Sequence, residues 1–220
     1  MAKTILICGK TGTGKTSAIR TLDPKETVIL RVINRTLPFR YKDMYVEGKN
    51  LLYTPTYEDV KKWLDKVNQA KSIKNLVITD GTYLMRQEFI KRAKEIGYTK
   101  FSDMAQHMQQ LLLGIQQTRE DLKVFLEFHV DLDEAGQCFK AATVGKLLDE
   151  KYNIFENIDI ILFASPIYED KSSKYGFYTN HTLDRAGIEI PAKSPADMFS
   201  ELYIPNDLAL VAKAIDEYYG

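Results

Sequence analysis

The chain has 220 residues, of which 45% are hydrophobic and 27% are charged, which is ordinary for one soluble α/β domain. Lys plus Arg and Asp plus Glu number 30 each, so the formal net charge is zero. This balance argues against a protein that coats polyanions by bulk charge, because such binding depends on excess Lys and Arg. The two cysteines, Cys8 and Cys138, favour buried or free thiols over a disulfide framework or a zinc site.

The N-terminal residues run directly into an apolar strand and carry no signal-peptide pattern. No apolar run approaches the roughly 18 residues needed to span a bilayer. We therefore expect a cytoplasmic protein that has no membrane partner.

The first half of the chain predicts strands that alternate with helices. Thr56, followed by Asp59, is the expected N-cap of one of these helices. Asp23-Pro24 should end the first helix, since a residue before proline is pushed out of the α region. The predicted strands are 4–8, 27–33, 51–54 and 75–80, and the predicted helices are about 15–22, 56–70 and 83–96.

The second half continues this alternation. Asn206 or Asp207 is the expected cap of a C-terminal helix that reaches Tyr218. The other predicted helices are one over 102–120 and a short one over 145–152, and the other predicted strands are 123–129 and 159–164. Residues 131–142 are a polar excursion that forms either a hairpin or a mobile loop, and 167–169 with 176–179 are a predicted hairpin. Alternating strands and helices predict one α/β domain over residues 1–220, with a mainly parallel sheet, helices on both faces and a C-terminal β-hairpin.

A complete phosphate-binding loop follows the first strand. Its pattern, G-x-x-x-x-G-K-[ST], stands between an apolar strand and a helix, as that function requires. Glycines let backbone N–H groups approach phosphate oxygens, the lysine reaches the β and γ phosphates, and the threonine hydroxyl can bind Mg²⁺. The predicted nucleotide-binding residues are Gly9, Lys10, Thr11, Gly12, Thr13, Gly14, Lys15, Thr16 and Ser17. We expect ATP, or another nucleoside triphosphate, with Mg²⁺.

Asp80, at the end of the buried strand 75–80, is the predicted second magnesium residue beside Thr16. A helix N-cap is the alternative role for its carboxylate. The spacing of about 60 residues from the loop allows the Asp80 strand to lie directly beside the first strand.

Four segments together resemble a family of phage-encoded P-loop ATPases that have a RecA-type core and include single-strand annealing recombinases. These segments are GKTGTGKT, NLVITDGTYLM, FLEFHVD and TVGKLLDEK. The endings KSPADMF and IPNDLAL also look like that family. The resemblance implies a RecA-like ATPase that acts in phage DNA recombination or annealing. It also implies that the protein works as a homo-oligomer on single-stranded DNA, with a single-strand binding protein as a possible partner.

The resemblance also assigns roles by position. His129 would contact the γ-phosphate and act with Lys15 and Asp80 in catalysis, and Asp131 or Asp133 would orient it, join the metal shell or belong to a solvated loop. Residues 97–103 and 131–142 would be DNA-binding loops, in which Lys–aromatic pairs stack on bases. These pairs are Lys100 with Phe101 and Phe139 with Lys140. A neighbouring subunit's triphosphate would be reached by Lys146, Lys171 or Lys174, unless these are ordinary surface lysines.

The chain departs from that family at one position. RecA-like ATPases usually place a catalytic glutamate near the end of the second strand, where this chain has Asn34. Asn34 can orient a water molecule but cannot act as a base, while Glu47 lies in irregular sequence and Glu127 lies in a strand of uncertain facing. Slow or DNA-stimulated hydrolysis is therefore expected. Two other functions stay open: a P-loop small-molecule or nucleoside kinase, and a nucleotide-gated interaction protein with little hydrolysis.

Overall fold

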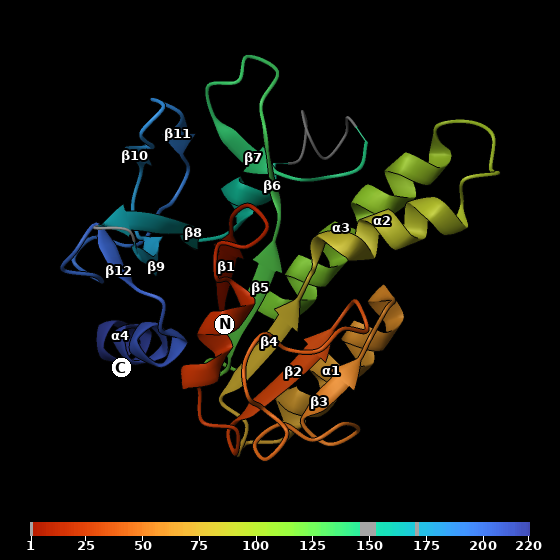
Figure 1. Ribbon diagram of the computed structural model, residues 1–220. Coiled ribbons are helices and arrows are strands. Elements are labelled where there is room, and N and C mark those ends of the chain that lie inside the picture. Colours follow the sequence, from red (N-terminus) through yellow and green to blue (C-terminus); the bar gives the residue numbers. More distant parts are fainter. Residues whose placement is uncertain (1, 146–152, 170–171) are drawn as a thin grey trace.

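The computed structural model describes residues 2–145, 153–169 and 172–220. Within these ranges one sheet has the strand order β12-β9-β8-β1-β5-β4-β2-β3 (Figure 1). Its strands are β1 (Lys3–Cys8), β2 (Thr27–Arg31), β3 (Leu51–Tyr53), β4 (Asn75–Thr79), β5 (Lys123–Phe128), β8 (Ile160–Glu169), β9 (Ser172–Tyr178) and β12 (Tyr203–Pro205). The six strands from β8 to β3 pair in parallel, whereas β9 and β12 are antiparallel additions.

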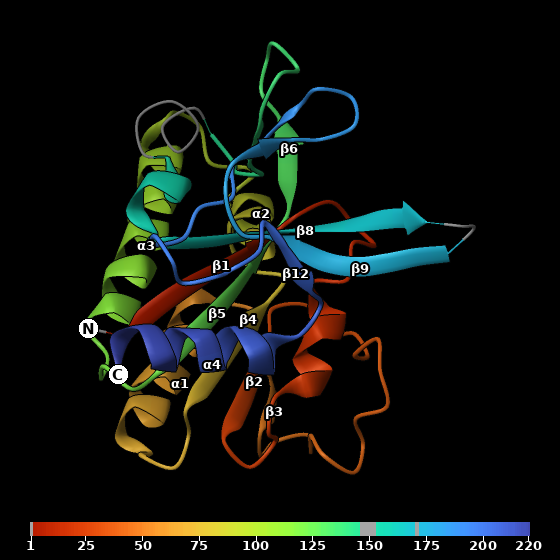
Figure 2. The same ribbon diagram turned by 90° about the vertical axis from the view of Figure 1, so that its left-hand side faces the viewer.

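Helices cover both faces of this sheet. One hydrophobic core lies under α1 (Tyr57–Gln69), α2 (Thr82–Lys91) and α3 (Thr99–Gln116), and the other lies under the 3₁₀ helix η1 (Thr16–Thr21) and α4 (Leu208–Tyr219). Figure 2 shows α4 running across one face of the sheet. Successive side chains of β1 point to opposite faces of the sheet, so Leu6 packs in the first core and Ile7 in the second. The predicted α/β fold, with a mainly parallel sheet, helices on both faces and a β8–β9 hairpin, is confirmed.

Small elements stand above the carboxyl ends of the central strands. They are the hairpins of β6 (Val130–Leu132) with β7 (Phe139–Ala141) and β10 (Thr182–Leu183) with β11 (Glu189–Ile190). The 3₁₀ helix η3 (Ile154–Asn157) instead leads into the start of β8. The predicted polar excursion is therefore a β-hairpin, one of the two forms the sequence allows. The predicted helix over 145–152 and the residues Lys146 and Lys171 lie outside the described residues.

The caps of α1 and α4 agree with the sequence. Thr56 accepts a hydrogen bond from the Asp59 amide, and Asp207, rather than Asn206, accepts one from the Leu210 amide. The helix after the phosphate-binding loop differs from expectation, because it is a six-residue 3₁₀ helix in which the Ala18 amide is shared between the carbonyls of Gly14 and Lys15. A helix this short gives phosphates a smaller dipole than a full α-helix, so the loop's own N–H groups carry more of the expected attraction.

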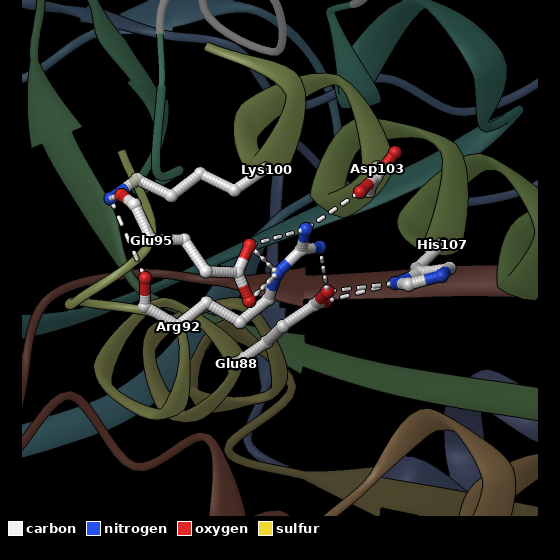
Figure 3. A network of polar contacts seen from close by, with 6 residues as sticks. All are labelled: Glu88, Arg92, Glu95, Lys100, Asp103 and His107. Atoms are coloured by element: carbon white, nitrogen blue, oxygen red, sulfur yellow. Dashed lines mark hydrogen bonds and ion pairs between the residues drawn. The ribbon is translucent and has the colours of Figure 1, made fainter. Parts of the chain in front are cut away.

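The α2–α3 pair is held by a network of polar side chains (Figure 3). The Arg92 guanidinium contacts the carboxylates of Glu88, Glu95 and Asp103 at 3.2 Å or less, and His107 Nδ1 lies 2.9 Å from Glu88 Oε1. Shared partners make such a network more effective than isolated surface ion pairs. It fixes α2, which begins two residues after Asp80, against α3.

No helix among the described residues combines the length and the apolar character needed to cross a membrane.

Candidate nucleotide-binding site

The phosphate-binding loop bounds a cavity of about 700 Å³ at the carboxyl ends of the parallel strands. The lining residues come from the loop with η1, the segment after β2, the ends of β4 and β5, β9, and the end of β12 with the cap of α4. They are Thr11, Gly12, Thr13, Gly14, Lys15, Thr16, Ser17, Arg20, Arg35, Pro38, Phe39, Asp80, His129, Tyr175, Pro205, Asn206 and Asp207. The structure therefore brings together Lys15, Thr16, Asp80 and His129. Open-sheet α/β proteins commonly bind ligands at this edge.

Gly9 and Lys10 lie outside the cavity lining and contribute through the backbone. Their carbonyl oxygens accept hydrogen bonds from Lys15 Nζ at 2.8 and 2.7 Å, while the Lys10 ammonium lies 4.9 Å from the centre of the Phe139 ring. Lys15 is only 7% exposed, and desolvation by burial lowers the pKa of its ammonium, partly opposed by the charge of Glu127. A lysine held in this way is positioned for an anion, since its buried charge lacks a hydrogen-bonded carboxylate among the described residues.

Gly14 shows why the loop needs glycine. Its φ of +89° is left-handed, and an added Cβ would lie 2.9 Å from the Tyr175 ring. Its carbonyl accepts a hydrogen bond from Asn206 Nδ2 at 2.9 Å, and Arg20 in turn donates to Asn206 Oδ1 at 2.8 Å. The loop is therefore braced by Asn206, which lies 192 positions away in the sequence. Sequence reasoning assigned Asn206 only a capping role.

Glu127 is the main residue whose role the sequence left undecided. It points from β5 to the face of the sheet that carries η1, where its Oε2 accepts a hydrogen bond from the Thr16 hydroxyl at 2.7 Å. It is 2% exposed, and its Oε1 is buried without a hydrogen-bond partner. Burial raises the pKa of its carboxyl to about 7, against the opposing effects of Thr16 and Lys15. A charged residue two positions after Phe125, inside the apolar run 124–128, was the available signal.

Asp80 does not lie where the spacing suggested. Strand β5 pairs with both β1 and β4, so it separates the Asp80 strand from the loop strand. Asp80 also does not cap α2, because the N-cap is Gly81 and no side-chain cap bond forms. With φ at +57°, Asp80 instead directs its carboxylate toward the cavity, where Oδ1 lies 3.7 Å from both His129 Nε2 and Arg35 Nη2.

His129 follows β5 and joins the site to the β6–β7 hairpin. Its amide donates to Thr82 Oγ1 at 2.9 Å, and its ring meets the edge of Tyr83 with centres 5.9 Å apart. A second cavity of about 360 Å³ extends from His129 and Lys10 to Asp131. Asp133, by contrast, accepts hydrogen bonds from the Gln137 and Cys138 amides and so stabilises the hairpin turn.

The aromatic residues proposed for base stacking are largely packed inside the protein. Phe139 is 4% exposed and lies 5.1 Å, centre to centre, from Phe163. Phe101 belongs to α3 and stacks on Phe89, with Lys100 near both rings. These positions therefore contribute to packing in this structure, contrary to the open platforms expected.

The site contains oxygen donors suited to Mg²⁺ only in combination with phosphates. No group of three or more His, Cys, Asp or Glu residues within the described ranges forms a metal site by itself. Mg²⁺ commonly takes one or two protein carboxylates together with substrate phosphates, and the Thr16 hydroxyl with the Asp80 carboxylate in the cavity lining fits that pattern. Glu127, which is bonded to Thr16, has a second oxygen, Oε1, that is buried without a hydrogen-bond partner.

A larger cavity of about 1010 Å³ lies between β9, β12 and α4. It shares Tyr175 and Pro205 with the loop cavity but contains none of the loop residues. Volume alone does not identify a site, and the buried cation and carboxylate place the candidate chemistry at the smaller cavity.

Comparisons with known proteins add little to this description. No protein-family model matches the chain, and no curated protein matches it. Among solved structures, the chain is similar to a KaiC-like protein from the hyperthermophilic archaeon Pyrococcus horikoshii, at 14% identity and a TM-score of 0.43, over 80% of this chain and 76% of that one. A likeness of this size carries no argument about activity, so function rests on the site itself.

Proposed function

We propose that this chain binds a nucleoside triphosphate, with ATP the expected nucleotide, together with Mg²⁺, and that it hydrolyses the nucleotide slowly as a RecA-like ATPase. One observation carries the proposal: the complete loop holds a buried Lys15 and a Thr16 hydroxyl, bonded to Glu127, at one wall of a cavity. Backbone N–H groups and Lys15 would bind the phosphates, while Glu127 would orient the Thr16 oxygen. Asp80 and His129 would face the terminal phosphate.

Mg²⁺, when bound, would neutralise charge on the phosphate oxygens, and Thr16 with Asp80 are the proposed protein residues of its site. Glu127 joins this proposal because it already accepts the hydrogen of the Thr16 hydroxyl, which would leave the lone pairs of that oxygen free for a metal ion. Its Oε1, which is buried without a hydrogen-bond partner, would attract a cation to the site when the carboxyl is ionised.

Slow hydrolysis is proposed because the cavity offers few carboxylates that could act as a base. Among the described lining residues, only Asp80 and Asp207 have carboxylates, and Asp207 is engaged in capping α4. Asp80 is paired with Arg35 and His129, and Asn34 supplies no base. The chain therefore has limited means to activate a water molecule.

Single-stranded DNA is the proposed polymeric partner, acting on a homo-oligomer in phage recombination or annealing. The support is the resemblance in sequence and the tip of the α2–α3 pair, where Tyr98 is 87% exposed. Lys91 and Lys94 are exposed at the same tip. An open tyrosine ring among cations suits base stacking and phosphate contact better than the buried Phe139.

Phosphate release should test this function directly. With Mg·ATP, we expect slow release that single-stranded DNA increases several-fold, while Lys15→Ala stays at background in both conditions. Tight ATP binding without release would instead favour the nucleotide-gated interaction protein, and transfer of phosphate to a small acceptor would favour a kinase. Release by the wild type no faster than by Lys15→Ala would contradict the ATPase proposal.

A further inference from the structure

Arg35 lies in the cavity wall, one residue after Asn34, the position near which the RecA-like family usually has a glutamate. It comes four residues after the end of β2 and lines the same cavity as Lys15 and Thr16. Its guanidinium lies 3.7 Å from Asp80 Oδ1, and its Cζ is 5.7 Å from the centre of the Tyr83 ring.

The backbone of Arg35 is held in place by a buried side chain. Arg31, which is 4% exposed, donates to the Arg35 carbonyl at 2.8 Å. The same guanidinium binds both carboxylate oxygens of Glu47, at 2.6 and 2.7 Å. Both contacts with Glu47 are made by Nη2, while Nη1 donates to the Arg35 carbonyl, so one buried guanidinium ties the two residues together through charge-assisted hydrogen bonds. The Arg35 side chain is nevertheless 52% exposed. Its backbone is therefore held in place while its guanidinium can move within the cavity.

The other cationic side chains of the cavity, Lys15 and Arg20, make shorter polar contacts with the protein than Arg35 does. Arg20 donates to the carbonyl of Ser17 at 2.6 Å and to Asn206 Oδ1 at 2.8 Å, and Lys15 is bound to the loop's own carbonyls. Arg35 makes a longer ion pair with Asp80, without a hydrogen bond to it. Its guanidinium can therefore exchange this carboxylate for a phosphate at low cost, since exposed ion pairs contribute little.

We propose that Arg35 is this chain's own γ-phosphate-binding cation, which distinguishes a nucleoside triphosphate from a diphosphate without help from a second subunit. This inference rests on the proposed nucleotide-binding function. The Arg35 guanidinium stands beside Asp80, and both residues line one cavity with His129, Lys15 and Thr16. Guanidinium N–H groups match phosphate oxygens in charge and in planar geometry.

The test compares Mg·ATP with Mg·ADP by isothermal titration for the wild type, Arg35→Ala, Arg35→Lys and Arg40→Ala. Arg40 is the matched control, because it is exposed on the same segment but does not line the cavity. We expect Arg35→Ala to weaken ATP at least about tenfold while ADP changes less than about twofold. Arg35→Lys should recover part of the ATP affinity, and Arg40→Ala should change neither.

A role for Arg35 in merely supporting the cavity wall would change the affinity for both nucleotides together. Equal losses for ATP and ADP, or no loss for either, would therefore overturn the inference while leaving nucleotide binding intact. A wild type that binds neither nucleotide would instead refute the proposed function, and this inference with it.

Discussion

Replacing Lys15 by alanine is expected to lower the affinity for ATP at least about 100-fold, or roughly 3 kcal/mol. The substitution removes a charge that is 7% exposed and lies at the cavity wall. It also removes the two hydrogen bonds by which Nζ holds the carbonyls of Gly9 and Lys10, so the loop loses its internal support. Equilibrium titration with a fluorescent ATP analogue measures the change.

Lys10→Ala is the matched control, since it removes the same charge from the same loop. Its ammonium lies over Phe139 and borders the second cavity, so affinity should stay within a few-fold of the wild type. An affinity of Lys15→Ala within threefold of the wild type would show that the buried ammonium does not bind the phosphates.

Replacing Glu127 by glutamine is expected to change the pH dependence of stability. Burial raises the pKa of the Glu127 carboxyl from 4.5 to about 7, so the folded protein binds a proton that the unfolded chain has released at neutral pH. The contribution of this group to stability is fully present below pH 4.5 and is lost as the pH rises through about 7. Glutamine stays neutral and keeps an oxygen that can accept a hydrogen bond from Thr16. The variant therefore does not lose stability at this position as the pH rises.

The melting temperature of Glu127→Gln, relative to that of the wild type, should therefore be higher at pH 8.5 than at pH 5.5, by roughly 5 °C. Glu120→Gln serves as the control, because the Glu120 side chain is 79% exposed and its removal should change stability equally at both pH values. A Glu127→Gln difference that is the same at pH 5.5 and pH 8.5 would mean that the carboxyl is already ionised throughout this range.

Local pattern predicted the parts of the site that depend on neighbouring residues in the chain. The Gly9–Thr16 loop, its position between a strand and a helix, and the cap at Thr56 all follow from short-range chemistry, and they are confirmed as structural features. The prediction of an ordinary helix after the loop was wrong in its type, because a six-residue 3₁₀ helix and an α-helix of that length favour similar residues.

The sequence could not predict features that depend on strand order. Placing β5 between β1 and β4 moves Asp80 away from the loop strand and puts Glu127 directly beneath Thr16. Parallel strands of similar apolar composition carry no local signal for which of them are neighbours. The same holds for Asn206, which reaches Gly14 only because β12 joins the far edge of the sheet through β9.

The central claim is that the loop cavity binds a nucleoside triphosphate with Mg²⁺. Isothermal titration of the wild-type protein with ATP, in Mg²⁺ and in excess chelator, tests it most directly. We predict one site per chain, with affinity that is at least about tenfold higher when Mg²⁺ is present. The absence of saturable binding in both conditions would contradict the account.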